Sequence, residues 1–188
     1  PHLNYVSGDP VTIPCRIIKS ATELALMQKA SDITVAAIKA GISQLKEGMS
    51  PADLSSIING AQGQLGGEPD FALCLFGEAS AFPHGTTQPR KLKKGDIVLM
   101  DCGCRVQGYC SDITRTTVFG AAPTKRQQEI WNLEQQSQAA GFAAAKIGSA
   151  CEDIDAAARK VITDAGFGPG YKLPGLPHRT GHGIGMDG

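Results

Sequence analysis

The feature that most constrains this chain is an internal repeat with an offset of one hundred residues. Matched residues at this offset are Gly41 and Gly141, Lys46 and Lys146, Gly48 and Gly148, Asp53 and Asp153, and Gly66 and Gly166. The alternative is two amphipathic helix pairs that resemble each other by chance. Because the glycines match as well as the apolar residues, we interpret the repeat as a duplication with two related halves.

Each half is predicted to open with a long helix followed by a shorter one. Apolar residues recur at three- and four-residue steps over residues 24–45 and again over 130–147, which is typical of one buried helix face. Ser20, with a glutamate three residues later, is a capping box before the first helix. The shorter helices have their inner faces within residues 54–61 and 154–161.

The first half then continues into strands. The segments "FALCLF" (71–76), "DIVLMDCG" (96–103) and "YCSDITRTTVFG" (109–120) have strand composition, and the last two predict a hairpin. Too few residues follow position 182 to build a matching second hairpin. We therefore expect an α+β fold whose second half is incomplete, and we expect the chain to be a fragment.

Two acids in the predicted hairpin are candidate metal ligands. Asp101 follows the apolar run "IVLM" and shares a strand face with Leu99, where an unpaired carboxylate would be costly. If the hairpin folds about residues 106–107, Asp101 and Asp112 stand directly opposite each other, with Cβ atoms ~4.5–5.5 Å apart. Such a pair can bind one divalent ion or two ions spaced ~3.5–4 Å. Two solvated edge acids, or a pair sharing one proton, remain alternatives.

The cysteines offer a second interpretation of the same hairpin. Cys102, Cys104 and Cys110 could form a zinc site, but the one-residue gap between the first two is short for structural zinc and no fourth ligand is evident. All six cysteines are expected to be free thiols, because the chain is too large to need disulfides for stability. Free thiols favour a cytoplasmic location.

Composition excludes several classes of function. The formal net charge is +0, so nothing predicts a nucleic-acid surface. The sequence contains no run of about 18 or more apolar residues, so it predicts no membrane span. A chain of 188 residues can form one domain with a substantial core.

Three phrases carry a resemblance to a known family. "FPHGT", "DIVLMDCGCRVQGYCSDITRT" and "HRTGHGIGMD" resemble the pita-bread metallopeptidases of the M24 type. Within that family they are most similar to the Xaa-Pro dipeptidase (prolidase) and aminopeptidase P branch. The resemblance implies a pita-bread fold, with two related αα-β halves around a curved, mainly antiparallel sheet. It assigns residues 18–188 to a catalytic domain truncated at its C-terminal end and residues 1–17 to a linker remnant from a preceding domain.

The resemblance also implies roles for five residues. Asp101, Asp112 and His182 match metal ligands, and His84 and His178 match histidines that contact the scissile peptide or the tetrahedral intermediate. The implied cofactor is a pair of divalent ions, with manganese favoured and cobalt, zinc or iron as alternatives. The implied substrate is an Xaa-Pro dipeptide or short proline-containing peptide, and the implied assembly is a homodimer.

The sequence departs from the family pattern at its end. A further histidine and two glutamate ligands of the family would lie beyond Gly188, so we expect this fragment to be inactive and to bind metal weakly or not at all. Rival functions are aminopeptidase P acting on longer peptides, methionine aminopeptidase, and a non-catalytic pita-bread binding protein. A metal-free, creatinase-like hydrolase is disfavoured by the two aspartates.

Overall fold

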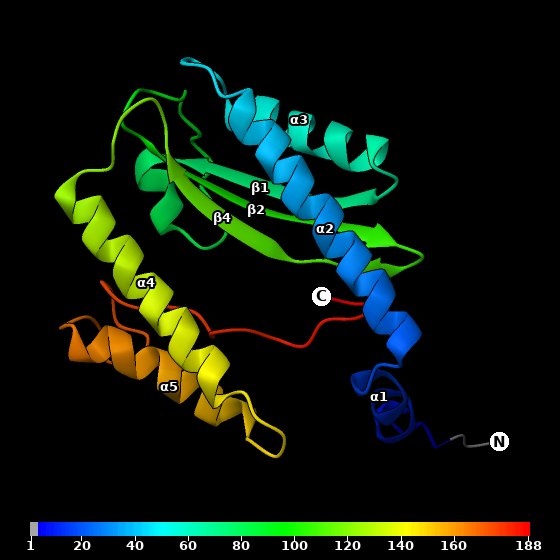
Figure 1. Ribbon diagram of the computed structural model, residues 1–188. Helices are drawn as coiled ribbons and strands as arrows, with labels where there is room; N and C mark the ends of the chain where they lie inside the picture. Colours follow the sequence, from blue (N-terminus) through cyan, green and yellow to red (C-terminus); the bar gives the residue numbers. More distant parts are fainter. Residues whose placement is uncertain (1–3) are drawn as a thin grey trace. The chain divides into compact units, whose positions relative to one another are not determined.

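The computed structural model describes residues 4–188, and within them the chain forms two compact units (Figure 1). Unit 1 contains the described residues up to Phe119 together with Gly183–Gly188. Unit 2 contains Gly120–His182.

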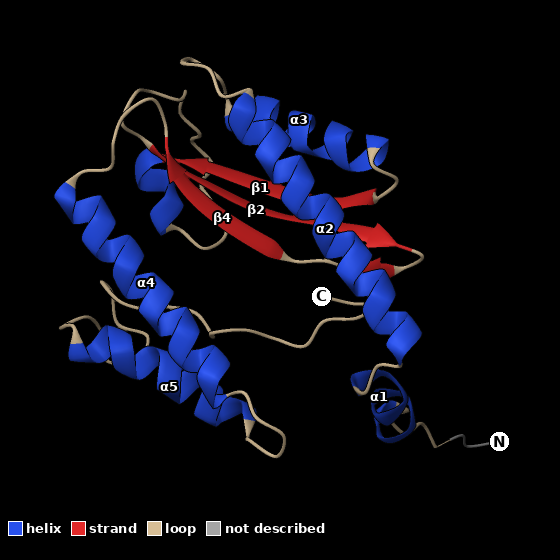
Figure 2. Cartoon of the chain, viewed as in Figure 1, coloured by secondary structure: helices blue, strands red, loops and turns tan. Residues whose placement is uncertain are grey.

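Unit 1 is a sheet with helices on one face. Its elements are α1 (Asp9–Ile17), α2 (Ala21–Ser43), α3 (Pro51–Gln64), β1 (Glu68–Phe76), the 3-10 helix η1 (Gly77–Ala81), β2 (Ile97–Val106), β3 (Tyr109–Cys110) and β4 (Ile113–Val118). The strands pair antiparallel, with β2 between β1 on one side and both β3 and β4 on the other. Helices α2 and α3 lie along the same face of this sheet (Figure 2).

The two helices begin where their capping residues predict. The Ser20 hydroxyl accepts from the Glu23 amide at 3.3 Å, and the Glu23 carboxylate accepts from the Ser20 amide at 2.6 Å. Ser50 and Asp53 form the same reciprocal pair before α3, with Pro51 as the first helical residue. The predicted capping box at Ser20 is therefore confirmed, because both orphan amide groups find side-chain acceptors.

The core of unit 1 lies between the helix pair and one face of β2. Val98, Met100 and Cys102 alternate along that face and are fully buried. They pack in one cluster with Ile38 and Ile58 of the helices. Intervening residues on β2 face the other way and are only half-buried, as period-2 alternation requires. The second face of the sheet is therefore the more open one.

The hairpin register differs from the sequence prediction. The turn is formed by Gln107 and Gly108, which both have positive φ, at 50° and 83°. This is the combination that a two-residue type I′ turn needs. Asp101 consequently pairs with Thr114, so the predicted direct opposition of Asp101 and Asp112 is wrong. The partner moves by two residues, and Asp112 therefore stays on the same face as a diagonal neighbour of Asp101.

The predicted single strand from residue 109 to 120 is also interrupted. Paired residues end at Cys110 and resume at Ile113. At the break the Cys104 amide donates to the Ser111 hydroxyl at 3.1 Å. Gly103 is needed beside it, because a Cβ there would lie 2.3 Å from the Ser111 carbonyl oxygen. The Ser111 hydroxyl thus takes the place of a backbone carbonyl as the acceptor for the Cys104 amide, immediately before Asp112.

Unit 2 is built on a second helix pair, α4 (Lys125–Ala144) and α5 (Cys151–Asp164). Gly141 of α4 faces Ala158, where an added Cβ would lie 3.4 Å from the Ala158 Cβ. One hundred residues earlier, Gly41 of α2 faces Ile58 in the same way. The predicted repeat is therefore visible as the same glycine at the same helix crossing. Residues after α5 run to His182 without further helix or strand.

The expected linker over residues 1–17 includes helix α1, none of whose residues is buried. Residues 1–3 of that segment lie outside the part of the chain that the structure describes. The predicted domain boundaries, 1–17 and 18–188, stay a prediction. Within residues 4–188 there is no helix with the length and apolar character to span a membrane.

Candidate active site

Asp101 lies in the middle of the sheet on the face that the helices leave open. It stands between Leu73 of β1 and Thr114 of β4 in the strand register. The Thr114 hydroxyl donates to Asp101 Oδ1 at 2.7 Å. The carboxylate is half-buried, and the neighbouring Leu99 on its own strand is apolar. One oxygen of the Asp101 carboxylate is therefore oriented by a hydrogen bond on the open face of the sheet.

Asp112 is positioned by the buried residue before it. Ser111 is 1% exposed, and its hydroxyl lies 2.8 Å from the Thr34 hydroxyl of α2. The Ser111 amide donates to the Cys104 carbonyl at 2.9 Å. With Ser111 anchored on the helix side, strand alternation directs the exposed Asp112 toward the open face that carries Asp101.

The anchor of Ser111 extends into a small buried polar cluster between sheet and helices. Gln62 Nε2 of α3 donates to the Thr34 hydroxyl at 3.4 Å, and both residues are fully buried. Cys104 Sγ lies 3.4 Å from the same hydroxyl. Sequence reasoning missed these positions, since a polar residue on a predicted helix face gives no sign of its partner across seventy residues.

His84 belongs to the loop after η1 and is exposed. It lines a cavity of about 140 Å³ together with Leu73, Leu75 and Arg90. The adjoining Gly85 lies close to β1, since a Cβ added to Gly85 would be 3.4 Å from the Leu73 side chain and 3.3 Å from the Leu75 side chain. Leu73 is directly opposite Asp101 and shares its face. The His84 loop is therefore held against the open face of the sheet.

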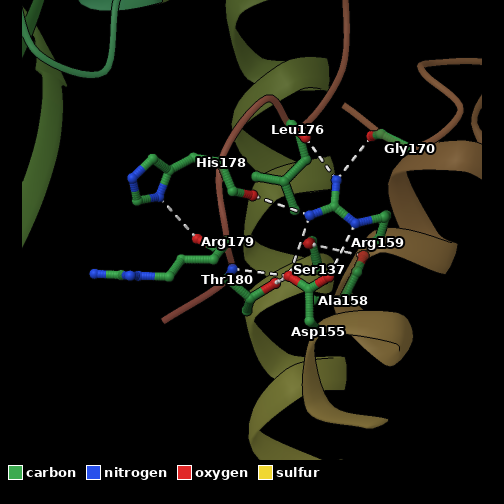
Figure 3. Close-up of polar contacts among 9 residues, drawn as sticks. All are labelled: Ser137, Asp155, Ala158, Arg159, Gly170, Leu176, His178, Arg179 and Thr180. Carbon is green, nitrogen blue, oxygen red and sulfur yellow. Dashed lines mark hydrogen bonds and ion pairs between the residues drawn. The ribbon is translucent and has the colours of Figure 1, made fainter. Parts of the chain in front are cut away.

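His178 and His182 lie in unit 2, in the segment after α5. Nδ1 of the His178 ring lies 3.0 Å from the Arg179 carbonyl oxygen (Figure 3). The backbone carbonyl of His178 accepts a hydrogen bond from Arg159 Nη2 at 3.0 Å. His182 is exposed and is the last residue of the unit. The polar network around Arg159 is shown in Figure 3.

That network rests on one ion pair within α5. Arg159 contacts Asp155 through two hydrogen bonds, at 3.0 and 3.1 Å. Asp155 Oδ1 also accepts from the amide and hydroxyl of Thr180, at 2.9 and 2.7 Å. Arg159 first, and Thr180 next, lower the pKa of Asp155 to about 2. The four-residue spacing of acid and arginine is a readable helix pair, but its contact with residue 180 could not be read from sequence.

Residues 183–188 belong to unit 1 and lie beside the hairpin. The Cys110 amide donates to the Gly185 carbonyl at 2.7 Å, and Arg105 Nη1 donates to the Met186 carbonyl at 2.7 Å. Arg16 of α1 forms an ion pair with Asp187 at 2.7 Å. These contacts fasten the "GIGMD" phrase to the turn end of the strands.

The cysteine zinc site does not form. Cys102 and Cys104 point into the core on the helix side of β2, whereas Cys110 pairs with Arg105 and so faces the other way. Burial raises the pKa of the Cys110 thiol, which disfavours a thiolate ligand. All six cysteines are free, as expected.

The arrangement supplies two carboxylates on one face of the sheet, and carboxylate oxygens are donors that hard divalent ions such as Mn(II) accept. Within residues 4–188 no group of three or more His, Cys, Asp or Glu side chains lies close enough to hold a metal ion. The ligand assignment of Asp101, Asp112 and His182 therefore stays a prediction, as do the substrate roles of His84 and His178.

Comparison with curated proteins finds relatives named as peptidases. The chain is 39% identical over 173 residues to an uncharacterised peptidase of Staphylococcus aureus, covering 91% of this chain and 48% of that protein. It is 39% identical over 183 residues to an uncharacterised peptidase of Schizosaccharomyces pombe, covering 95% and 39%. The chain thus spans about half or less of the length of these relatives.

Solved structures confirm the fold. The prolidase from Pyrococcus furiosus matches with a TM-score of 0.87 and 32% identity over 96% of this chain and 52% of its own. The Xaa-Pro dipeptidase from Bacillus anthracis matches with 0.84 and 32%, covering 93% and 48%. The X-Pro aminopeptidase from Thermotoga maritima matches with 0.86 and 26%, covering 95% and 50%. The α+β, pita-bread fold expected from the sequence is therefore confirmed.

The family assignment follows from a match that covers most of the chain. Residues 25–188 match the description of metallopeptidase family M24. The matched range includes both aspartates of the open sheet face and the three histidines that the sequence singled out. This chain belongs to metallopeptidase family M24.

Proposed function

We propose that this chain forms part of an Xaa-Pro dipeptidase, a metal-dependent enzyme that hydrolyses the peptide bond before proline. The observation that carries the proposal is the likeness to the Pyrococcus furiosus prolidase over 96% of the chain. Two aspartates on the open face of the sheet support it, because carboxylates are donors that divalent ions accept. A second candidate, an aminopeptidase P acting on longer Xaa-Pro peptides, is favoured by the likeness to the Thermotoga maritima enzyme.

The proposed ligands are Asp101, Asp112 and His182, which would hold two divalent ions in the intact site. Manganese is our first assignment, with cobalt, zinc or iron as alternatives. Bound ions of this kind lower the pKa of a bound water and supply hydroxide near neutral pH. The Thr114 hydroxyl, 2.7 Å from Asp101 Oδ1, would keep that carboxylate oriented. His84, which adjoins the open face, would donate to the peptide oxygen as charge develops.

We further propose that these 188 residues alone turn over no Xaa-Pro substrate. Family resemblance assigns further ligands, and they are not among the residues of this chain. A homodimer is proposed on the same resemblance. A cytoplasmic location is supported by six free thiols, four of them buried.

The test is a peptide panel on the protein encoded by the complete reading frame, assayed with Mn(II), Co(II), Zn(II) and Fe(II). Xaa-Pro dipeptides should be cleaved, and Asp101→Asn and Asp112→Asn should each lower kcat by about 10³-fold or more, since each removes a metal ligand. Preference for longer Xaa-Pro peptides would favour the second candidate. Cleavage only after an initial methionine, or no cleavage with any metal, would contradict both.

A further inference from the structure

Arg159 uses every donor it has. Its side chain is 14% exposed, and Nε and Nη2 donate to the two oxygens of Asp155. Nη1 donates to the carbonyls of Gly170 and Leu176, at 2.8 and 2.6 Å, and Nη2 also donates to the carbonyl of His178 at 3.0 Å. A guanidinium has five N–H donors in a fixed planar fork, so this set saturates it.

These bonds replace regular secondary structure. Residues 165–182 form neither helix nor strand, and their backbone groups need other partners. Arg159 satisfies carbonyls before and at His178, while Asp155 accepts the amide of Thr180 two residues later. The Tyr171 ring lies over the guanidinium, with Arg159 Cζ 4.5 Å from the ring centroid, and adds a cation–π contact to the network. The segment is thus held on both sides of His178, as Figure 3 shows.

The neighbouring ion pair on the same helix shows what an ordinary surface pair looks like. Lys160 and Asp164 also stand four residues apart, at 2.6 Å, but their side chains are 72% and 63% exposed. Such a pair contributes little to stability. Arg159 and Asp155 are only 14% and 28% exposed. Their burial is explained by the backbone groups that they bind, not by their attraction for each other.

We propose that Arg159, oriented by Asp155, is a positioning residue for His178. By holding the His178 carbonyl and the Thr180 amide, the pair sets the direction in which the imidazole leaves the backbone. The His178 Nδ1 atom lies 3.0 Å from the Arg179 carbonyl oxygen, and this contact restricts rotation of the ring about the Cβ–Cγ bond. That His178 contacts a peptide substrate rests on the proposed function, but the positioning of its backbone does not.

The first experiment needs no activity. Amide hydrogen exchange is measured by NMR on the 188-residue chain for the wild type, Arg159→Lys, Asp155→Asn and the matched control Lys160→Ala. Lysine keeps the charge but has three donors instead of a planar fork. We expect the Thr180 amide to exchange about tenfold faster or more in both network variants. The control should match the wild type, and the helix amides of α5 should stay protected in all four proteins.

Exchange at Thr180 within twofold of the wild type in both network variants would overturn the proposal. If either variant unfolds the helix pair, as reported by Trp131 of α4, then Thr180→Val decides the question. That variant removes only the hydroxyl contact to Asp155 and leaves Arg159 in place. Faster exchange over residues 176–182 is expected, and unchanged exchange there would contradict the proposal.

The second experiment uses the enzyme from the complete reading frame and a double-mutant cycle. Arg159→Lys should lower kcat about tenfold or more at unchanged metal content, and Lys160→Ala should not change it. Added to His178→Ala, the Arg159→Lys change should have no further effect, since its role is exerted through His178. Additive losses would mean that Arg159 acts elsewhere. Absence of Xaa-Pro cleavage by the wild type would refute the proposed function and leave the exchange result to decide positioning.

Discussion

The pairs α2–α3 and α4–α5 are one helix pair in two surroundings. In unit 1 a sheet packs against the pair, and Leu54 and Ile58 are both 0% exposed. Residues 120–182, all of them described, form no strand. There the counterpart of Leu54, Ile154, is half-buried, whereas Ala158, the counterpart of Ile58, is 1% exposed.

The difference separates two contributions to burial. Residues at the helix crossing are buried in both units, since the glycine of the long helix admits the shorter helix in each. Residues that would face a sheet are buried only where a sheet exists. Ala30 of α2 is 0% exposed, and its counterpart Ile130 is 40% exposed. Helix pairing is therefore a local property of each half, and the sheet adds the larger apolar core to unit 1 alone.

The largest expected effect comes from truncating the same repeat position in both units. Leu54→Ala should lower the free energy of unfolding of unit 1 by about 3–4 kcal/mol, because it leaves a cavity in a closed core. Ile154→Ala in unit 2 should cost less than half as much. Urea unfolding followed by circular dichroism, with Trp131 fluorescence for unit 2, measures both. Equal losses would mean that the sheet adds nothing to the packing of its helices.

The next effect tests the hairpin, which unit 1 has and the described part of unit 2 lacks. Gly103→Ala should cost about 2 kcal/mol or more, because its Cβ would lie 2.3 Å from the Ser111 carbonyl oxygen. Gly60→Ala is the matched control, since nothing lies within 4 Å of its Cβ in α3. That control should stabilise by about 0.5–1 kcal/mol. A neutral Gly103→Ala, measured by urea unfolding, would contradict the close approach that precedes Asp112.

A smaller effect on stability is expected from removing one buried hydroxyl on the long helix of each unit, Thr34 of α2 or Ser137 of α4. Thr34→Val removes the hydroxyl that joins Ser111 and Gln62, and should cost about 1–3 kcal/mol because buried polar atoms lose their partner. Ser137→Ala removes only a bond to the Ala158 carbonyl, at 3.0 Å, and should cost about 1 kcal/mol. Thermal unfolding of both variants checks the ranking. The reverse ranking would argue that Thr34 does not couple helix to hairpin.

The smallest expected effect is a loss of folding stability at acid pH, which has a separate cause in each unit. Folding lowers the pKa of Asp155 from 3.8 to about 2, so its stabilisation is present above pH 3.8 and is lost as pH falls toward 2. In unit 1, hydrogen bonds from Tyr109 and Ser20 lower the pKa of Glu23 from 4.5 to about 2, with the same sign. Asp155→Asn should flatten the acid limb of Trp131 fluorescence unfolding, and Glu23→Gln should leave that limb unchanged. If the loss of stability at acid pH persists in Asp155→Asn, titratable groups other than Asp155 cause it.

Much of the fold was predictable because its signals are local. Helix faces, the capping box at Ser20 and the matched glycines depend on residues within a few positions of one another. The strand register was predicted wrongly because it depends on which two residues form the turn. The glycine of the pair Gln107–Gly108 was the available sign that the turn lies one residue later.

For the candidate site, the sequence identified residues and the structure identified what holds them. Asp101 and Asp112 were singled out from strand alternation, and their common face survives the corrected register. Their supports, Thr114 and Ser111, could not be predicted, because each acts through a partner brought close by the sheet.

The sequence by itself determined the repeat, the two helix pairs, the sheet face of Asp101 and the family. Those properties follow from periodic patterns and short phrases, which are local. Only the tertiary structure decided the register, the break at Ser111 and the saturated fork of Arg159. These depend on contacts between residues distant along the chain, such as Thr34 with Ser111. Their partners are selected by packing as the elements come together, and no local pattern encodes that selection.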